Sequence, residues 1–300
     1  MLNGVINVYK EKGYTSHDVV AKLRGILKQK KIGHTGTLDP EAEGVLPVCL
    51  GNATKLCDML TEKRKEYIAE FLCGVVTDTQ DMTGTVLSRS KTDLTEEAVR
   101  TVIMSFLGES DQIPPMYSAC KVNGRRLYEL AREGKEVERK ARRITIYELE
   151  ILGMELPNVT IRVLCSKGTY IRTLCHDIGQ KLGCGAAMQS LLRTRVERFT
   201  LADARRLDEI KEFWEKDEIG RILLPVDAMF ETLPAITVTP FFLTALQNGN
   251  PLYLRQIKGK SGWMDGEQTR VYDEAGKFYG IYAFLAMKGR FQPVKMFLEG

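Results

Sequence analysis

Helical and strand-like spacings of apolar residues alternate through the first third of the chain. Residues 4–10 form a short apolar run that predicts a strand. We expect Ser16 to cap the helix that follows, because apolar residues recur at helical spacing directly after it. These apolar positions are Val19, Val20, Leu23, Ile26 and Leu27. Residues 32–55 are interrupted by glycines and prolines, so a structured loop is expected there rather than a long helix or strand.

The middle of the chain carries the alternation of apolar and polar residues that is typical of antiparallel strands with one wet face. Residues 66–86 predict a strand, a turn and a return strand. Thr95 then has the features of a helix N-cap, and Gly108 is expected to stop that helix. Residues 144–152 and 158–174 alternate in the same way, which predicts two further strands.

In the last of these strands, we expect the side chains of Tyr170 and Arg172 on opposite faces. Helices are expected around residues 176–183 and from 185 to 195, where they would cover the sheet. Residues 209–221 also look helical. The fold class predicted by this order of elements is α+β, with a mixed, mainly antiparallel sheet flanked by helices.

The C-terminal part of the chain differs in pattern from the rest. Prolines near residues 230–236 suggest a boundary, and short β-like runs separated by turn residues follow it. We therefore expect one large domain at residues 1–232 and a small β-rich domain at residues 233–300.

Composition places the chain among ordinary globular proteins, with 44% hydrophobic and 27% charged residues in a length of 300. The N-terminus lacks the apolar core of a signal peptide, and no long uncharged apolar run occurs, so we expect a soluble, cytoplasmic protein without a membrane span. The seven cysteines are scattered and never spaced as CxxC, which favours reduced, buried thiols. Three dispersed histidines predict no metal site.

Positive charge is concentrated between Lys121 and Arg143, although the net charge of the chain is only +4. This segment carries nine Lys or Arg residues against four acids, a local excess of five positive charges. Tyr117 and Tyr128 lie among these bases. A solvated helix face has such a composition, and so does a surface that contacts a nucleic acid.

Three residues are candidates for chemistry. Asp39 is framed by glycines and precedes Pro40, which disfavours helical geometry; the carboxylate either projects into a cleft or satisfies its own turn. Arg172 would favour the ionised form of a nearby carboxylate, or would form an ordinary surface ion pair. Tyr67 would present its ring to a base, or would pack in the core. The residues alone leave each of these alternatives open.

Several motifs in this order closely resemble one family, the TruB-type tRNA pseudouridine(55) synthases. The motifs are GVINVYKEKGYTS, KIGHTGTLDPEAEGVLPVCLGNATK, KEY, TDTQDMTG, QIPPMYSACKVNGRRLYELAREG, SKGTYIRTLCHDIG and GCGAAMQSLLRTRVERF. The resemblance covers residues 2–227, and the tail with its GNP near residues 248–251 is similar to the family's C-terminal PUA domain. One departure is Glu11, which stands where the family usually has proline.

The resemblance implies roles for residues of this chain. Asp39 matches the essential catalytic aspartate, Tyr67 the ring that stacks on the target base, and Arg172 the arginine that pairs with the aspartate. Leu191 matches an apolar residue of the pocket, and His34 the histidine associated with flipping nucleotides out of the stem-loop.

Lys167 and Tyr170 match positions in a strand near the base. An RNA-binding insertion at about residues 88–150 is also implied, which would account for the basic cluster. Its candidate RNA-binding residues are Lys121, Arg125, Arg126, Arg132, Arg142 and Arg143.

The implied reaction breaks the N1–C1′ bond of a uridine, turns the base and joins C5 to C1′, which requires a flipped-out base and one carboxylate. It requires no cofactor and no metal. Asp39 would attack the base, attack C1′ or remove a sugar proton, and the sequence does not choose among these routes. The implied partner is the TΨC stem-loop of tRNA, bound by a monomer with no obligatory protein partner.

Other functions stay open at this point. The chain would also suit a guide-dependent pseudouridine synthase subunit, or a tRNA-binding or folding factor without essential catalysis. A glycosidase or phosphotransferase is disfavoured, because the sequence shows no second catalytic carboxylate and no phosphate-binding loop.

Overall fold

A ten-stranded sheet forms the centre of the larger part of the molecule in this computed structural model, which describes residues 1–122 and 124–298. Its main path runs in the order β14-β1-β3-β12-β4-β11-β10-β7, with β2 beside β3 and β13 beside β12. Neighbouring strands are antiparallel except β12 and β3, which are parallel. The strands are β1 (Gly4–Lys10), β2 (Ile32–His34), β3 (Glu43–Leu50), β4 (Lys65–Cys73), β7 (Gly108–Gln112), β10 (Arg142–Glu155), β11 (Asn158–Cys165), β12 (Ala186–Val196), β13 (Phe199–Thr200) and β14 (Leu223–Leu224).

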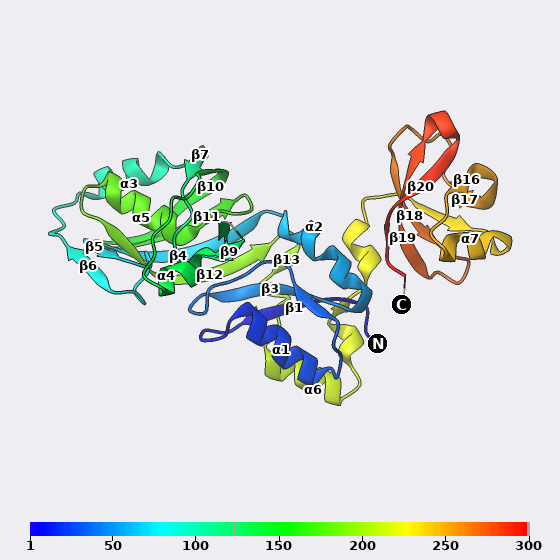
Figure 1. Cartoon of the computed structure of the whole chain (residues 1–300), viewed down its shortest axis with the longest axis horizontal. Helices are drawn as coiled ribbons and strands as arrows, with labels where there is room; N and C mark the ends of the chain where they lie inside the picture. The colour runs from blue at the N-terminus through cyan, green and yellow to red at the C-terminus, as the bar shows by residue number, and fades with distance from the viewer. Residues whose placement is uncertain (123, 299–300) are drawn as a thin grey trace.

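Helices cover this sheet in two groups (Figure 1). Helices α1 and α6 pack on the half that contains β1 and β3, and α3 and α5 pack on the half that contains β4, β10 and β11. Each group closes its own core of fully buried side chains, such as Leu23 against Ile6 in one and Ile178 against Phe71 in the other. The helices are α1 (Ser16–Ile26), α2 (Cys57–Thr61), α3 (Glu96–Met104), α4 (Leu127–Arg132), α5 (Ile171–Lys181), α6 (Leu207–Glu215) and α7 (Leu243–Gln247).

Two hairpins lie outside the large sheet, and a second sheet lies at the C-terminal end. The hairpins are β5 (Val75–Thr77) with β6 (Val86–Arg89) and β8 (Lys121–Val122) with β9 (Arg125–Arg126). The second sheet contains β15 (Ala235–Val238), β16 (Leu252–Tyr253), β17 (Ile257–Gly259), β18 (Gln268–Tyr272), β19 (Phe278–Leu285) and β20 (Arg290–Met296). The predicted α+β class with a small β-rich C-terminal part is therefore confirmed.

The two sheets share a hydrophobic core. Phe297 and Ile281 from the C-terminal part pack in one cluster with Val5 and Leu56 from the N-terminal part. The backbone carbonyl of Phe297 also accepts a hydrogen bond from the Asn52 side chain. Figure 1 shows the C-terminal sheet in orange and red beside the segment that carries α2.

Two predictions about the first 55 residues are wrong. The N-cap of α1 is Thr15, whose hydroxyl accepts from the Asp18 backbone, while Ser16 points elsewhere. The segment expected to be only a loop contains β2 and the eight-residue strand β3. Its glycines are compatible with a strand because they permit close approach, as at Gly44, where an added Cβ would lie 2.2 Å from the Arg193 carbonyl oxygen.

Residues 165–196 also differ from the prediction. β11 ends at Cys165 and α5 begins at Ile171, so Arg172 lies in a helix and Tyr170 directly precedes it. The expectation of opposite faces was also wrong for a strand, because residues two apart in a strand share a face. The helix expected from residue 185 to 195 is strand β12. Two irregularities in the pairing of β12 with β4 interrupt its alternation of side chains, which is why the period of a strand was not visible in the sequence.

Other predictions hold. Thr95 caps α3, although the helix ends at Met104 and Gly108 instead begins β7. All seven cysteines are free thiols, and five are buried. Among the described residues, no helix has the length and apolarity needed to cross a membrane.

Candidate active site

A pocket of about 570 Å³ opens where β4, β12, the start of α5 and the loop before β3 meet. Asp39, Tyr67, Arg172 and Leu191 all line it, although they come from four distant segments of the chain. The fold thus brings together the central residues predicted from the sequence.

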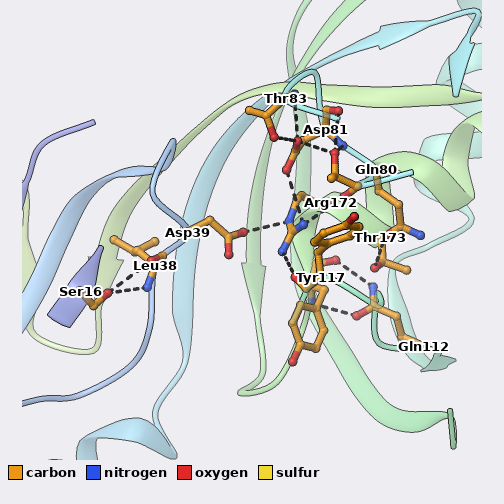
Figure 2. Close-up of polar contacts among 12 residues, drawn as sticks. Ser16, Leu38, Asp39, Gln80, Asp81, Thr83, Gln112, Tyr117, Arg172 and Thr173 are labelled. Atoms are coloured by element: carbon orange, nitrogen blue, oxygen red, sulfur yellow. Dashed lines mark hydrogen bonds and ion pairs between the residues drawn. The ribbon is translucent and has the colours of Figure 1, made fainter. Parts of the chain in front are cut away.

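The Asp39 carboxylate is held by Arg172. Its Oδ2 lies 2.9 Å from Nε of Arg172, whose side chain is only 5% exposed, whereas that of Asp39 is 40% exposed. The guanidinium is fixed by further bonds, from Nη1 to the Thr79 carbonyl at 3.0 Å and from Nη2 to the Tyr117 carbonyl at 2.8 Å. Asp81 lies 3.5 Å from Nη1. Figure 2 shows Arg172 at the centre of these contacts, joined to both Asp39 and Asp81.

Asp81 is itself held in place by its own loop. Its Oδ1 accepts hydrogen bonds from the Thr79 hydroxyl at 2.8 Å and from the Thr83 backbone N–H at 3.0 Å. The neighbouring Gln80 accepts from the Thr173 hydroxyl on α5 at 2.8 Å. The loop between β5 and β6 is thereby fastened to the helix that carries Arg172, as Figure 2 shows.

The loop that carries Asp39 is tied to two other elements. The buried hydroxyl of Ser16 accepts from the Leu38 N–H at 2.9 Å and lies 3.4 Å from the Leu38 carbonyl oxygen (Figure 2). On the other side, Nζ of the fully buried Lys10 donates to the Pro40 carbonyl at 3.0 Å and to the Tyr14 carbonyl at 2.6 Å. These bonds fix the backbone on both sides of Asp39.

Glu11 stands at the position where the resemblance implies a proline. Its backbone carbonyl accepts from Lys10 Nζ at 3.1 Å, and its carboxylate pairs with Arg206. These contacts hold the backbone between β1 and α1 without a proline.

Tyr67 and Leu191 form an apolar part of the pocket. Both are nearly buried, and they lie on the adjacent strands β4 and β12. Burial raises the pKa of Tyr67 to about 12, so its hydroxyl stays neutral at ordinary pH. Tyr170 also lines the pocket, at the N-terminus of α5, where Gln112 bonds both its N–H at 2.8 Å and its carbonyl at 3.0 Å.

Charged residues surround the mouth of the pocket. Lys167 lies in the turn after β11, not in a strand as predicted, and pairs with Glu62. Arg142 and Arg143 stand at the start of β10 and also line the pocket. Arg143 pairs with Glu109 at 2.9 Å.

The other predicted RNA-binding residues lie on the hairpin β8–β9 and on α4. Arg125 pairs with Glu133, and Arg126 donates to the Tyr128 hydroxyl at 2.8 Å. The Arg132 guanidinium lies 5.4 Å from the centre of the Tyr128 ring. Lys121 is exposed on β8. Acids of the same segment neutralise part of the charge of these bases, as Glu133 does for Arg125.

His34 is placed away from the lining of the pocket. It lies on β2, where its ring meets that of His17 edge to face at 5.3 Å. Burial, and then the charges of His17 and Arg193, lower the pKa of His34 to about 4, so the ring is neutral. Its part in flipping nucleotides therefore stays a prediction.

Two buried bases that the sequence reasoning did not single out also line the pocket, Lys65 and Arg193. Each is two residues from a predicted site residue on the same strand, Tyr67 and Leu191 respectively. For Arg193 that signal was hidden, because β12 was predicted to be a helix. No cluster of three or more His, Cys, Asp or Glu that could hold a metal occurs within residues 1–122 and 124–298.

Solved structures share this architecture. A chain in the structure of an H/ACA ribonucleoprotein bound to a substrate RNA containing 2′-deoxyuridine is 27% identical and superposes with a TM-score of 0.72 over 98% of this chain and 85% of that one. A chain of a Cbf5–Nop10–Gar1 complex is 29% identical, with a TM-score of 0.72 and the same coverage. Together with the family models and relatives reported next, this shared architecture places the chain in one class, the pseudouridine synthases.

The particular family follows from the sequence comparisons. The family model described as "TruB family pseudouridylate synthase (N terminal domain)" matches residues 24–171, and that of the "tRNA pseudouridylate synthase B C-terminal domain" matches residues 172–231. The chain belongs to the TruB family. Proteins called tRNA pseudouridine synthase B are 53% identical in Lachnoclostridium phytofermentans and 43% identical in Clostridium kluyveri, each over 99% of this chain and 100% of the relative.

Proposed function

We propose that the chain isomerises the uridine at position 55, in the TΨC stem-loop of tRNA, to pseudouridine. The observation that carries the proposal is the ion pair of 2.9 Å between Asp39 and Arg172 in a pocket that also presents Tyr67. The names of the relatives that match along the whole chain support tRNA as the substrate.

The geometry accounts for the steps that such a reaction needs. A pocket of about 570 Å³ is in the range that holds a small ligand, so it has room for a flipped-out nucleoside. Tyr67 would stack on the base, while Leu191 and Tyr170 would exclude water from it. Asp39 would act as the catalytic carboxylate, because it lines the pocket and is the more exposed of the two acids beside Arg172.

The surface around the pocket is suited to RNA. Arg142, Arg143 and Lys167 would contact phosphates at the mouth of the pocket. The exposed bases of the insertion at about residues 88–150 would extend this contact along the stem. We further propose residues 1–232 as the catalytic domain and residues 233–300 as a PUA-like RNA-binding domain, in a monomer that acts in the cytoplasm and needs no protein partner.

The first experiment measures tritium released to water from an unmodified tRNA transcript labelled at C5 of its uridines. Release follows directly from the reaction, because C5 loses its hydrogen when it is joined to C1′. The expected result is release by the wild-type chain alone and none by Asp39→Asn. A transcript with cytidine at position 55 is the matched substrate control, and it should release no tritium.

Each alternative predicts a different result. Tight tRNA binding without release would favour a guide-dependent subunit, the second candidate suggested by the likeness to a chain of the Cbf5–Nop10–Gar1 complex. A binding or folding factor would keep its cellular role in the Asp39→Asn variant. Release from the cytidine-55 transcript would contradict the assignment to position 55.

A further inference from the structure

Two buried cations in the lining of the pocket have no ion-pair partner among the described residues. Lys65 and Arg193 are 8% and 1% exposed, and neither forms an ion pair within the part of the chain that the structure describes. A buried positive charge is costly unless it is paired. Their position in the wall of a pocket indicates that the compensating charge comes from a ligand.

The Arg193 guanidinium uses only part of its donors. Nε donates to the Val45 carbonyl at 2.7 Å and Nη2 to the Gly36 carbonyl at 3.3 Å, while the buried Nη1 has no hydrogen-bond partner. Arg193 is the cross-strand partner of Tyr67, so both side chains project from the same face of the sheet. Arg193 Nη1 therefore lies beside the ring proposed to stack on the base, and the Tyr67 hydroxyl is the side-chain group that interacts with the Arg193 guanidinium.

Lys65 stands two residues before Tyr67 on β4 and thus on the same face. Its Nζ donates to the Thr61 and Lys63 carbonyls, each at 2.9 Å, which uses two of its three N–H groups. The two cations converge at Gly36, where an added Cβ would lie 3.5 Å from Cε of Lys65 and 3.8 Å from Nη1 of Arg193.

The site therefore has two parts of opposite charge. In the first, Arg172 faces both Asp39 and Asp81, so two carboxylates surround one guanidinium. In the second, Lys65 and Arg193 donate to backbone carbonyls and form no ion pair within the described residues, and the Tyr67 hydroxyl is the side-chain group that interacts with Arg193. The first part, with its two carboxylates, is placed to act on the ribose. The second part, with its two cations, is placed to bind the part of the substrate that becomes negatively charged.

We propose that Arg193 and Lys65 stabilise the negative charge that the uracil acquires when it is detached from the ribose. The inference rests on the proposed function and deepens it. When the N1–C1′ bond breaks, its electron pair stays with N1 and is shared with O2 and O4 of the base. C1′ is relieved of its electron deficiency by bonding to Asp39, or by loss of the C2′ proton to Asp39.

The same charges also explain how the detached base is retained. The uracil must turn before C5 bonds to C1′, and an anion between two fixed cations stays in the pocket while it turns. C5 then bonds to C1′ as the C1′–Asp39 bond breaks, or, in the alternative route, as Asp39 returns its proton to C2′. The C5 proton then goes to water and N1 takes up a proton, so the product is neutral and Asp39 is again a carboxylate. Preorganised charges of this kind act without reorganising during the reaction.

The test uses single-turnover tritium release by the full-length chain and the affinity for tRNA. Arg193→Met should slow release by about 100-fold, the loss typical for removal of one electrostatic stabiliser, and leave the Kd for tRNA unchanged. Arg193→Lys retains the charge and should recover most of the rate. Arg195→Met is the matched control on the same strand: Arg195 pairs with Glu66 at 3.2 Å outside the pocket lining, and its loss should leave the rate unchanged.

A second substrate shows whether Arg193→Met is slow because the uracil anion is less stabilised or because the fold is damaged. A tRNA with 5-fluorouridine at position 55 carries a base that departs more readily as an anion, because fluorine withdraws electrons. The rate at which 5-fluorouridine disappears from the digested RNA should therefore be less sensitive to Arg193→Met than tritium release from uridine. A structural defect would slow both substrates equally.

Lys65→Met provides an independent test if Arg193→Met does not fold, because it leaves the Val45 and Gly36 carbonyls with their donor. Like Arg193→Met, Lys65→Met should slow the reaction of 5-fluorouridine less than it slows tritium release from uridine. Wild-type rates in both variants, or equal deficits on the two bases, would overturn the inference while leaving the proposed function intact. Absence of tritium release by the wild-type chain would instead refute the proposed function, and the inference with it.

Discussion

The hydroxyls of the adjacent residues Thr15 and Ser16 form hydrogen bonds to different parts of the chain. Replacing each of them in turn therefore tests whether Ser16 positions the Asp39 carboxylate. The Thr15 hydroxyl caps α1 by accepting from the Asp18 N–H at 3.0 Å. The Ser16 hydroxyl accepts from the Leu38 N–H at 2.9 Å, one residue before Asp39. We expect Ser16→Ala to impair the reaction and Thr15→Ala to spare it.

The two variants should lose comparable stability. Ser16→Ala leaves the buried Leu38 N–H without an acceptor, which costs about 1–3 kcal/mol of the free energy of unfolding. Thr15→Ala removes an N-cap, which costs about 1 kcal/mol. The rate should differ, because only Ser16 holds the Asp39 loop. If the conformation of the loop that places Asp39 for reaction becomes less stable by about 1–3 kcal/mol, the activation free energy rises by that amount and the reaction slows by about 5- to 150-fold.

Urea denaturation gives the two free energies of unfolding, and single-turnover tritium release gives the two rates. Asp39→Asn sets the background of the rate assay. Equal rates for Ser16→Ala and Thr15→Ala, at comparable losses of stability, would refute the idea that the Ser16 bonds position the carboxylate.

Three further predictions concern other contacts of the site. Asp81→Asn weakens the second anchor of Arg172, 3.5 Å away, and should lower the single-turnover rate with little change in tRNA Kd. Replacing Arg126 and Arg132 by alanine should weaken tRNA binding and reduce the slope of log K against log salt by about 0.7–0.9 per lost phosphate contact, measured by filter binding. Burial lowers the pKa of Lys65 from 10.5 to about 8, so the unfolded chain binds more protons between these values. The wild type should therefore gain stability relative to Lys65→Met as pH rises from 8 to 10.5 in urea titrations.

Much of the fold was predictable, because most elements have an undisturbed period. The helix after Thr95 and the strands β10 and β11 follow regular patterns, and the structure contains them. The start of α5 was missed because strand-like alternation continues past Cys165, although Ile171, Leu174 and Ile178 already have helical spacing.

The candidate site was predicted unevenly for a different reason. The motifs identified Asp39 and Arg172, and the structure places them in contact. No motif identified Arg193. Because β12 was not recognised as a strand, the sequence did not indicate that this charged side chain is buried. Sequence position also did not show that Ser16, 22 residues before Leu38, bonds to the loop of Asp39.

The core shared by the two sheets has a consequence for how such chains diverge. Phe297, near the end of the chain, packs with Val5 and Leu56, near its beginning. A C-terminal part joined to the rest only by a linker can be exchanged between relatives without other changes. A C-terminal part that shares a hydrophobic core with the rest of the chain cannot. In relatives of this chain, residues at these three positions should therefore change size together, and chimaeras joined near residue 232 should fold only when both halves come from matched sequences.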